Sequence, residues 1–529
     1  MKLAYVILHY LAVKDTIECV TSIIENIDIT ENQLEIIVVD NGSPCEQYSE
    51  LEKLLNKYSG IHLLRSDDNL GFARGNNIGF NYAKHKLKAD FIILLNNDTV
   101  IKQKDFSDVI VRKYREYNYS VLGPDIITAD GFHQNPGSKQ EWTVKELNFF
   151  ILKKRIRLVL SYCHLDGLAD KFKKHDKEIY RPNAIEGDVK NTILHGACLI
   201  FSPQYIERFD GLNDQTFLYM EEDVLKLYSD FYGFLMLYSS DLSVFHKEDV
   251  ATNLIRSTNE ERVRLKSRRL IDSAKVYKSL KQKMRIKKKV FNVIEKIADK
   301  SKNEGGYSID LDIPVSYLMS YLMLRAMMLL RGKIKSIGVK SFGKKVFIGR
   351  RVKLRCKSMI QIGNGVTIHD KCYLDALSRN GIILKEGSSI GSGTIIRCSG
   401  NIHRIGKGFT IGKHSSLGDN CFVGATGGVE IGDNVIGGQN IRFHASNHNY
   451  SDTGTLIKKQ GITAKGIKVG DNCWIGAGVV FCDGVTIGSG CVIGANAVIT
   501  KNYPNNSVIV GESSRVLKLR TEKRGDNEN

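Results

Sequence analysis

Apolar runs of strand length alternate with amphipathic segments in the N-terminal part of the chain. The apolar runs predict buried strands at 4–8, 34–39, 61–64 and 91–95, and the patterns at 15–27 and 70–85 predict helices. Continuous apolar strands separated by helices are typical of a parallel sheet that is covered on both faces. Ligands of such sheets bind at the carboxyl ends of the strands. Asp40 and Asp98, which each follow a predicted strand, are therefore candidate site residues.

A short repeat replaces this alternation in the C-terminal part. Ten Ile-Gly or Val-Gly pairs recur between Ile348 and Gly494, many of them separated by multiples of six, and 32 of the 48 glycines lie from Gly338 onward. One aliphatic residue and one turn-forming glycine in six residues predict a short strand and a corner. Stacked coils of this kind bury a column of aliphatic side chains. An ordinary glycine-rich antiparallel domain is the alternative, and the regular spacing disfavours it.

Between these parts lies a strongly basic segment. Residues 256–302 contain 17 Lys or Arg against 5 Asp or Glu, with apolar residues at helical spacing, and residues 313–330 are richer in Leu and Met. A basic helix followed by an apolar, aromatic one predicts contact with an anionic membrane surface. The alternative is a solvated linker helix followed by a helix that packs on the first coil.

Composition narrows the functional classes. At 529 residues and with 42% hydrophobic residues the chain is expected to form several globular domains, which excludes wholesale disorder. The net charge of +18 suits anionic partners, but no nucleic-acid motif is present, so we expect no nucleic acid among them. The 11 scattered cysteines lack a CxxC pair and no apolar run is long enough to span a membrane, so a cytoplasmic location is expected.

Four segments and one histidine resemble the family 2 glycosyltransferases, in particular the rhamnosyltransferase-like enzymes. They are Val38–Ser43, Asn69–Gly79, Leu94–Thr99, Phe217–Val224 and His246. The resemblance covers about residues 1–255 and implies a GT-A-type α/β fold that binds a nucleotide-sugar. Asn96 departs from the family pattern, because it stands where the family has the first acid of its Asp-x-Asp motif.

This resemblance implies a site that holds a divalent metal, Mg²⁺ or Mn²⁺, against the diphosphate of the donor. Asp98 is implied as a metal ligand, with His246 beside the metal. Asp40 and Asn69 are implied to bind the nucleotide. Glu222 is our candidate for the base that takes the acceptor proton, and Asp223 is the alternative because three acids stand in a row.

Each of these residues also has a structural interpretation. An Asp at a strand end is often a turn or helix cap. The acids at 221–223 suit the start of a solvated helix, and His246 suits a hydrogen-bonded core position. The four segments in this order and spacing favour the enzymatic interpretation.

The C-terminal repeat resembles the left-handed β-helix acyltransferases, in particular the maltose/galactoside O-acetyltransferase branch. The matching segments are Val429–Val435, His448, Ile467–Gly478 and Gly484–Lys501. The resemblance implies acetyl-CoA as donor and a homotrimer with active sites between subunits. The coenzyme-binding positions that it implies are Trp474, Gly476, Ala477, Ala495 and Lys501.

The repeat breaks between Phe443 and Ile467, and this insertion holds His444 and His448. A loop that interrupts a rigid solenoid is a favoured place for chemistry. A neutral imidazole can take the proton of an attacking hydroxyl. His448 stands at the position of the family's histidine and is the predicted base, with His444 as the less favoured candidate. A solvated histidine, and a Trp474 that packs at a corner, are the structural alternatives.

The two resemblances predict a two-enzyme chain of surface-polysaccharide synthesis, such as that of capsule or O-antigen. It would transfer a sugar to a glycan or lipid-linked glycan and O-acetylate a glycan hydroxyl. The expected domains are 1–255, a helical connector at 256–335, the repeat domain at 336–520 and a polar tail at 521–529. In one alternative only the acetyltransferase works, beside a glycan-binding N-terminal domain. In the other, the solenoid is a scaffold that trimerises the glycosyltransferase.

Overall fold

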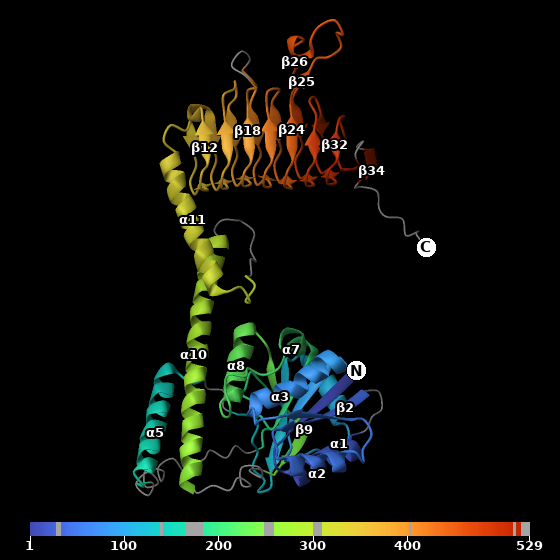
Figure 1. The fold of residues 1–529 in the computed structure, drawn as a ribbon, viewed down its shortest axis with the longest axis vertical. Helices are drawn as coiled ribbons and strands as arrows, with labels where there is room; N and C mark the ends of the chain where they lie inside the picture. The colour runs from blue at the N-terminus through green and yellow to red at the C-terminus, as the bar shows by residue number, and fades with distance from the viewer. Residues whose placement is uncertain are drawn as a thin grey trace. The chain divides into compact units, whose positions relative to one another are not determined.

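The protein, a computed structural model, folds as two compact units, Met1–Asn292 and Val293–Asn529 (Figure 1). The structure describes residues 1–27, 33–137, 141–165, 184–247, 259–299, 309–400, 405–511 and 515–519. The predicted tail at 521–529 lies outside the described residues. Each unit is considered by itself.

A nine-stranded sheet forms the centre of the first unit. The four predicted strands are confirmed as β1 (Lys2–His9), β2 (Gln33–Asn41), β3 (Ile61–Ser66) and β4 (Phe91–Asn96), which pair in parallel in the order β3-β2-β1-β4. The remaining strands are β5 (Thr99–Val100), β6 (Val121–Thr128), β7 (Asp188–Lys190), β8 (Cys198–Phe201) and β9 (Met236–His246). Strand β8 is antiparallel to both β4 and β6, so the complete sheet is mixed.

Helices cover both faces of this sheet, as the continuous apolar strands predict. Leu3, Tyr5 and Ile7 of β1 pack under one layer, and Ala4 and Val6 under the other. The first layer contains α1 (Val13–Asn26), α2 (Cys45–Leu55) and α4 (Phe106–Tyr117). The second contains α3 (Phe72–Asn81), the π-helix η1 (Tyr82–Leu87), α7 (Pro203–Arg208) and α8 (Glu221–Tyr232).

A separate small core joins α8 to two further helices, α5 (Val144–Tyr162) and α10 (Asn259–Asp299). Ile151 of α5, Val224 of α8 and Tyr277 of α10 are buried together in it. The first part of the basic segment is therefore a packed element of the first unit rather than a solvated linker. Figure 1 shows α5 and α10 lying alongside each other.

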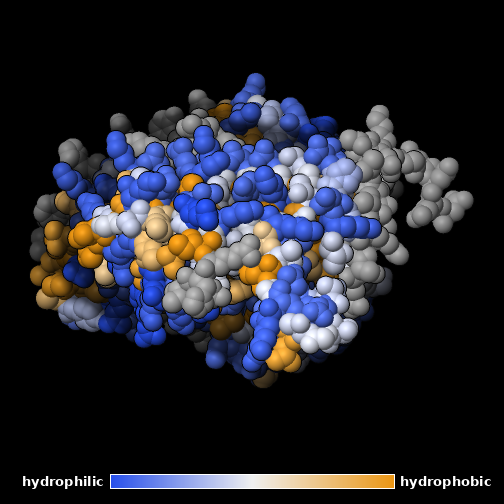
Figure 2. Space-filling model, turned by 90° about the horizontal axis from the view of Figure 1, so that it is seen from above, coloured by the Kyte–Doolittle hydropathy of each residue, from blue (hydrophilic) through white to orange (hydrophobic). Residues whose placement is uncertain are grey.

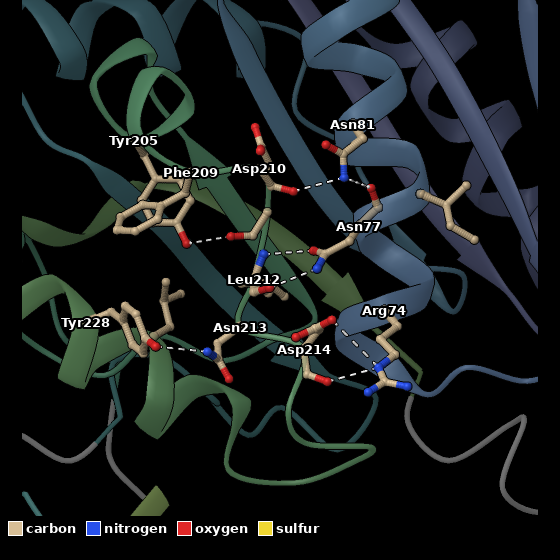
Figure 3. Close-up of a pocket in the computed structure, with 13 residues that line it drawn as sticks. Arg74, Asn77, Asn81, Tyr205, Phe209, Asp210, Leu212, Asn213, Asp214 and Tyr228 are labelled. Atoms are coloured by element: carbon tan, nitrogen blue, oxygen red, sulfur yellow. Dashed lines mark hydrogen bonds and ion pairs between the residues drawn. The ribbon is translucent and has the colours of Figure 1, made fainter. Parts of the chain in front are cut away.

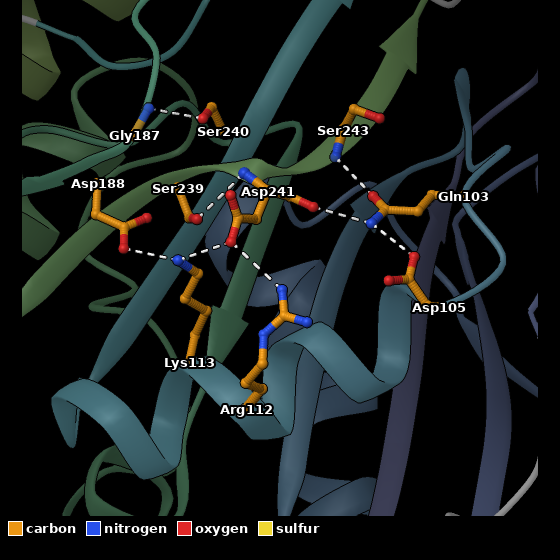
Figure 4. Close-up of polar contacts among 10 residues, drawn as sticks. All are labelled: Gln103, Asp105, Arg112, Lys113, Gly187, Asp188, Ser239, Ser240, Asp241 and Ser243. Carbon is orange, nitrogen blue, oxygen red and sulfur yellow. Dashed lines mark hydrogen bonds and ion pairs between the residues drawn. The ribbon is translucent and has the colours of Figure 1, made fainter.

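An ion-pair cluster holds an irregular stretch of β9 (Figure 4). The buried ammonium of Lys113 lies 2.7 Å from Asp188 and 2.9 Å from Asp241. Burial opposes the charge of Lys113, but the bonds to both carboxylates prevail and raise its pKa. Gln103 binds the carbonyl of Asp241 and the N–H of Ser243. These contacts fix the path of β9 toward its last residue, His246.

The second unit is a left-handed parallel β-helix, as the six-residue repeat predicts. Its first sheet contains β10 (Ser341–Phe342), β13 (Ile360–Ile362), β16 (Ile382–Leu384), β19 (Phe409–Ile411), β22 (Val429–Ile431), β27 (Ile467–Val469) and β30 (Thr486–Ile487). The second contains β11 (Phe347–Ile348), β14 (Thr367–Ile368), β17 (Ser389–Ile390), β20 (Ser416–Leu417), β23 (Ile436–Gly437), β28 (Trp474–Ile475), β31 (Val492–Ile493), β33 (Ser507–Val510) and β34 (Arg515–Leu519). The third contains β12 (Lys353–Arg355), β15 (Tyr373–Asp375), β18 (Ile395–Arg397), β21 (Phe422–Gly424), β24 (Arg442–His444), β29 (Val480–Phe481) and β32 (Val498–Ile499).

The coils stack through an interior of aliphatic side chains and a polar ladder at one corner. In the interior the repeated Ile and Val residues, and the stacked rings of Phe443 and Phe481, form one continuous core. At the corner, the side chains of Asp433, Asp471, Ser489 and Asn505 each accept the backbone N–H of the preceding coil. The outer surface is mostly hydrophilic, as Figure 2 shows for one face.

Two additions modify the β-helix. The insertion after β24 forms a small antiparallel pair, β25 (Asn447–His448) with β26 (Ile462–Thr463), and a 3₁₀ turn at Ile457–Lys459; a second 3₁₀ turn lies at Lys357–Met359. Helix α11 (Val315–Lys335) packs on the first coil, which is the alternative given above for this segment. The guanidinium of Arg325 lies 3.4 Å from the centre of the Phe347 ring. No helix in the described parts of the chain is long and apolar enough to cross a bilayer.

We expect Gly71→Ala to destabilise the first unit far more than Gly60→Ala. Both glycines have positive φ, at +84° and +82°. Gly71 also has ψ −169°, a combination almost confined to glycine, so backbone strain alone should cost Gly71→Ala about 1–3 kcal/mol. A Cβ on Gly71 would lie 2.2 Å from the Phe217 carbonyl oxygen, whereas one on Gly60 meets nothing within 4 Å. The additional clash should cost about 2 kcal/mol more. Hydrogen exchange of the buried amides of β1 measures the difference, and equal effects would contradict the packing argument.

Candidate active sites

Asp98 and His246, the predicted metal-site residues, lie side by side. Asp98 follows β4 and precedes β5, and the next residue, Thr99, pairs with His246 at the end of β9. The His246 Nε2 lies 3.2 Å from the Asp98 Oδ1. Both residues are buried, with exposed fractions of 6% and 8%. The fold therefore brings together two residues that are far apart in the sequence.

The bonding of His246 tests whether this pair suits a metal. Its Nδ1 lies 2.7 Å from Oε1 of Gln134, an atom that only accepts, so Nδ1 carries the hydrogen. With a proton on Nε2 the 3.2 Å contact with Asp98 is an ion pair; with that proton displaced, the Nε2 lone pair faces the carboxylate oxygen. Two lone-pair atoms at this separation suit a shared cation. An oxygen together with an imidazole nitrogen suits Mn²⁺ better than Mg²⁺.

Further protein ligands are few at this position. The described residues contain no group of three or more His, Cys, Asp or Glu side chains that could enclose a metal. The Asp98–His246 pair would therefore leave most coordination positions to water and to phosphate oxygens, as is usual where a metal binds together with a phosphorylated substrate.

The three acids at the start of α8 have different surroundings. An oxygen of Glu222 accepts the N–H of Gly196 at 3.2 Å. The indole N–H of Trp142 donates to Asp223 at 3.1 Å, so Asp223 faces the small core shared with α5 and α10. Glu221 is buried, and its Oε1 has no hydrogen-bond partner in the described structure. The structure thus gives Glu222 and Asp223 different surroundings, a difference that the sequence does not show.

The segment 195–197 connects Glu222 with the Asp98–His246 pair. The Ala197 carbonyl accepts the N–H of Asn96, which precedes Asp98 by two residues. The His195 ring lies 5.8 Å from the His246 ring, between centres. His195 is therefore a candidate site residue that was not predicted from the sequence. Its only signal is a histidine directly before the small residues Gly196 and Ala197 at the start of a strand.

Burial raises the pKa values of two of the acids. The pKa of Glu221 is raised to about 7, mainly by burial and then by the nearby charge of Glu222. The same two causes raise the pKa of Asp223 to about 6. Tyr219 and Met220, which precede α8, both have left-handed backbone conformations, at φ 79° and 67°. A strained backbone and a cluster of buried acids are typical of functional sites.

Asp40 is fully buried at the end of β2. Its Oδ1 accepts the N–H of Ser43, while its Oδ2 lies 3.5 Å from Nε of Arg65 without a hydrogen bond. On the neighbouring strand, in register with Asp40, the Nε2 of His9 is also buried without a partner. Burial lowers the pKa of His9 to about 4, so the ring is neutral. The Thr16 hydroxyl donates to the Ala12 carbonyl and lies 2.7 Å from the His9 Nδ1, so Nδ1 carries the hydrogen and Nε2 is an acceptor. The Asp40 Oδ2 and the His9 Nε2 thus lie at adjacent strand ends without a hydrogen-bond donor, which a ligand could supply.

Asn69 organises the loop before α3. Its side-chain oxygen accepts the N–H of Gly71 at 2.9 Å and the amide of Asn41 at 3.3 Å. Asn41 in turn accepts the N–H of Leu70 at 3.0 Å. The Asn69 side chain is thus engaged within the loop, and its effect on a ligand would be through the loop's shape.

A cavity of about 520 Å³ lies between α3, α8 and the loop at 209–214 (Figure 3). It contains none of the predicted site residues. Its polar side chains mostly bind one another or nearby backbone: Arg74 donates to the Asp214 carbonyl, Asn77 to that of Leu212, and Asn213 to the hydroxyl of Tyr228. These contacts anchor the loop to α3.

In the second unit, His448 lies in the insertion and is exposed. Its strand β25 pairs with β26, and Asn449 holds the same two segments together through Gln460 and Thr463. His444 lies at the end of β24, with its ring centre 5.6 Å from that of Phe422. His448 is thus on an ordered projection, whereas His444 is on the wall of the β-helix.

The predicted coenzyme-binding residues lie elsewhere on the coil. Trp474 is 58% exposed on the second sheet, paired with Ile436 and Val492. Gly476 and Ala477 form the following corner, where a Cβ on Gly476 would lie 2.6 Å from the backbone nitrogen of Ala495 in the next coil. His448 belongs to the corner after the third sheet. One chain therefore does not bring Trp474 and His448 to the same corner.

Lys501 lies beyond β32, at the C-terminal end of the coil stack, and is exposed. Its ammonium is 5.8 Å from the centre of the Tyr503 ring.

Family models match both units. The model of glycosyl transferase family 2 matches residues 5–176, the bacterial transferase hexapeptide model matches 466–501, and the model of the hexapeptide repeat of succinyl-transferase matches 408–437. The low-salt glycan biosynthesis hexosyltransferase Agl10 of Haloferax volcanii is 27% identical over 188 residues, which cover 36% of this chain and 50% of that protein. The chain thus spans half the length of that relative.

Nodulation protein L of Rhizobium meliloti is 30% identical over 136 residues, which cover 26% of this chain and 73% of that protein. A solved structure of galactoside acetyltransferase in complex with coenzyme A is 29% identical, with 26% of this chain and 64% of that chain covered and a TM-score of 0.23. The chain belongs to the hexapeptide-repeat transferases through its second unit, and its first unit carries a glycosyl transferase family 2 domain.

We expect Glu221→Gln to change how stability depends on pH. The folded carboxyl holds its proton up to a pH of about 7, whereas the unfolded one releases it at its ordinary pKa of 4.5. The free energy of unfolding of the wild type therefore falls as pH rises between these values. The variant lacks this loss. Between pH 5 and pH 8 its free energy of unfolding should therefore rise by about 2–3 kcal/mol relative to that of the wild type. Urea unfolding of both proteins at both pH values measures this change. A difference in unfolding free energy that does not depend on pH would contradict the raised pKa of Glu221.

Proposed function

We propose that the chain transfers a sugar from a nucleotide-sugar to a glycan and O-acetylates a glycan hydroxyl with acetyl-CoA. The observation that carries the first activity is the buried Asp98–His246 pair at the strand ends, connected through 195–197 to Glu222. The second is supported by a β-helix whose insertion presents an exposed histidine.

In the sugar transfer, Asp40 and His9 would bind the donor's base, because the Asp40 Oδ2 and the His9 Nε2 each lack a hydrogen-bond donor. Asp98 and His246 would hold the divalent metal, which neutralises the charge of the nucleotide-diphosphate leaving group. Glu222 would take the proton from the acceptor hydroxyl as that oxygen attacks the sugar. Asp223 is the weaker candidate, since it is bonded to Trp142 and faces the small core.

Glu222→Gln and Asp98→Ala are each expected to reduce sugar transfer by about 10³-fold or more, without unfolding the chain. Asp223→Asn is the matched control and should keep most of the rate. Release of the nucleotide diphosphate measures transfer, with hydrogen exchange of β1 as the folding control. Wild-type rates in both variants would refute the assignment. Absence of nucleotide-diphosphate binding with Mn²⁺ in calorimetry would instead favour a glycan-binding domain.

In the acetyl transfer, neutral His448 would take the proton of a glycan hydroxyl as its oxygen attacks the thioester carbon. Trp474, Gly476, Ala477, Ala495 and Lys501 would contact the coenzyme. Because Trp474 and His448 lie at different corners of one chain, a complete site needs His448 of one copy beside the coenzyme surface of another. This supports a homotrimer with sites between subunits.

His448→Ala is expected to reduce acetyl transfer by about 10²-fold or more while the trimer persists, and His444→Ala should retain most activity. Thiol release from acetyl-CoA with a glycan acceptor measures the rate, and analytical ultracentrifugation the assembly. Full activity of His448→Ala would refute the role. No acetyl transfer by the wild type would favour a solenoid that only trimerises the glycosyltransferase.

The acceptor that best unites the two activities is a lipid-linked surface glycan, such as a capsule or O-antigen precursor, at the cytoplasmic face of the membrane. Both domains then act on one product, and the basic helix α10 favours peripheral contact with an anionic membrane surface.

A further inference from the structure

Helix α5 presents an apolar stripe on the side that faces away from its packed core. Leu147 and Ile151 are buried against α8 and α10. On the other side Phe149, Leu152, Ile156 and Val159, spaced by three or four residues, are exposed at 69%, 53%, 52% and 60%. Residues at this spacing form one line along a helix. The helix is thus apolar on two faces, of which only one is covered by the described structure.

Cations border this stripe. The helix contains five Lys or Arg and one acid. Lys153 and Arg157 follow Phe149 by four and eight residues and so line one side of the stripe, while Arg155 lies on the other side. The one acid, Glu146, is held at the helix start in a capping box with Thr143. An apolar stripe between rows of cations is the arrangement of helices that lie in a membrane interface.

A cleft of about 500 Å³ beside the stripe is lined with cations from α5 and α10. Arg155 and Leu152 contribute from α5, and Lys275 and Lys278 from α10; no acid lines it. Lys278 donates to Asn148 at 2.7 Å, and Lys275 pairs with exposed Asp272 at 3.0 Å. Arg155 has no ion pair among the described residues. Three cations in a cleft next to an apolar stripe can receive the phosphate of a lipid headgroup.

We propose that the α5 stripe inserts into the headgroup region of an anionic bilayer, with lipid phosphates in the α5–α10 cleft. Only the purpose of this membrane contact rests on the proposed function: the contact would bring a lipid-linked acceptor to the sugar-transfer site. The site and the stripe are mechanically connected, because α5 shares its core with α8, whose first turn carries Glu222. Trp142, two residues before α5, also bonds Asp223.

The test is binding of the full chain to vesicles of phosphatidylcholine alone or with about 30% phosphatidylglycerol. We expect the wild type to bind the anionic vesicles at least tenfold better, and this preference to weaken as the salt rises from about 0.1 M to 0.5 M. The double variant F149S/I156S should bind at least tenfold more weakly, and Arg155→Gln about threefold more weakly at low salt. The substituted side chains are exposed, so both variants should remain folded. Unchanged hydrogen exchange of the buried β1 amides would show this.

The double variant M323S/I334S is the matched control, because these α11 residues are also exposed and apolar. It should bind within about twofold of the wild type. Equal loss in both double variants, unchanged binding of F149S/I156S, or equal binding to neutral vesicles would overturn the proposal. So would a change in oligomeric state of F149S/I156S with vesicle binding intact, which would assign the stripe to a second copy. Vesicle binding without any sugar transfer by the wild type would reject the proposed function alone.

Discussion

The antiparallel pairing of Thr99 with His246 is the contact on which the first unit's candidate site depends. It joins the chain just after the parallel strand β4 to the last residue of β9, and the N–H of Lys247, which donates to the Asp98 carbonyl at 3.0 Å, reinforces it. Because β9 must arrive in register, the Lys113 cluster that holds its irregular stretch contributes to the site from a distance. The geometry of this candidate site is thus a product of strand pairing rather than of one motif.

The start of α8 lies between two environments. Glu222 faces the strand ends, while Asp223 and the following apolar residues face the small core with α5 and α10. Holding carboxyl groups in this partly buried position raises the pKa of Glu221 and Asp223 and requires a strained approach through Tyr219 and Met220. The same core supports the α5 stripe, so sugar chemistry and lipid contact would share one mechanical support.

Periodic patterns made much of this fold predictable. The four N-terminal strands and the coils of the β-helix follow from apolar runs and from the six-residue spacing, because each places its aliphatic side chains in one interior. The direction of β8 was not predictable, since a short apolar run looks the same in either direction. The difference between Glu222 and Asp223 was not predictable either, because it depends on their contacts with Gly196 and Trp142. Helix α5 was not predictable because its apolar residues occupy two faces, which obscures the helical period.

The polar ladder of the β-helix has a direction. Every rung is a side chain of a later coil that accepts an N–H of the coil before it, from Asp433 to Asn505. During synthesis, the corner N–H of each coil therefore lacks its partner until the next coil has been made. The ladder also joins the coils on the two sides of the insertion that holds His448. At the C-terminal end of the stack, β34 pairs antiparallel with β33. This pairing covers the strand edge on which another coil could otherwise stack.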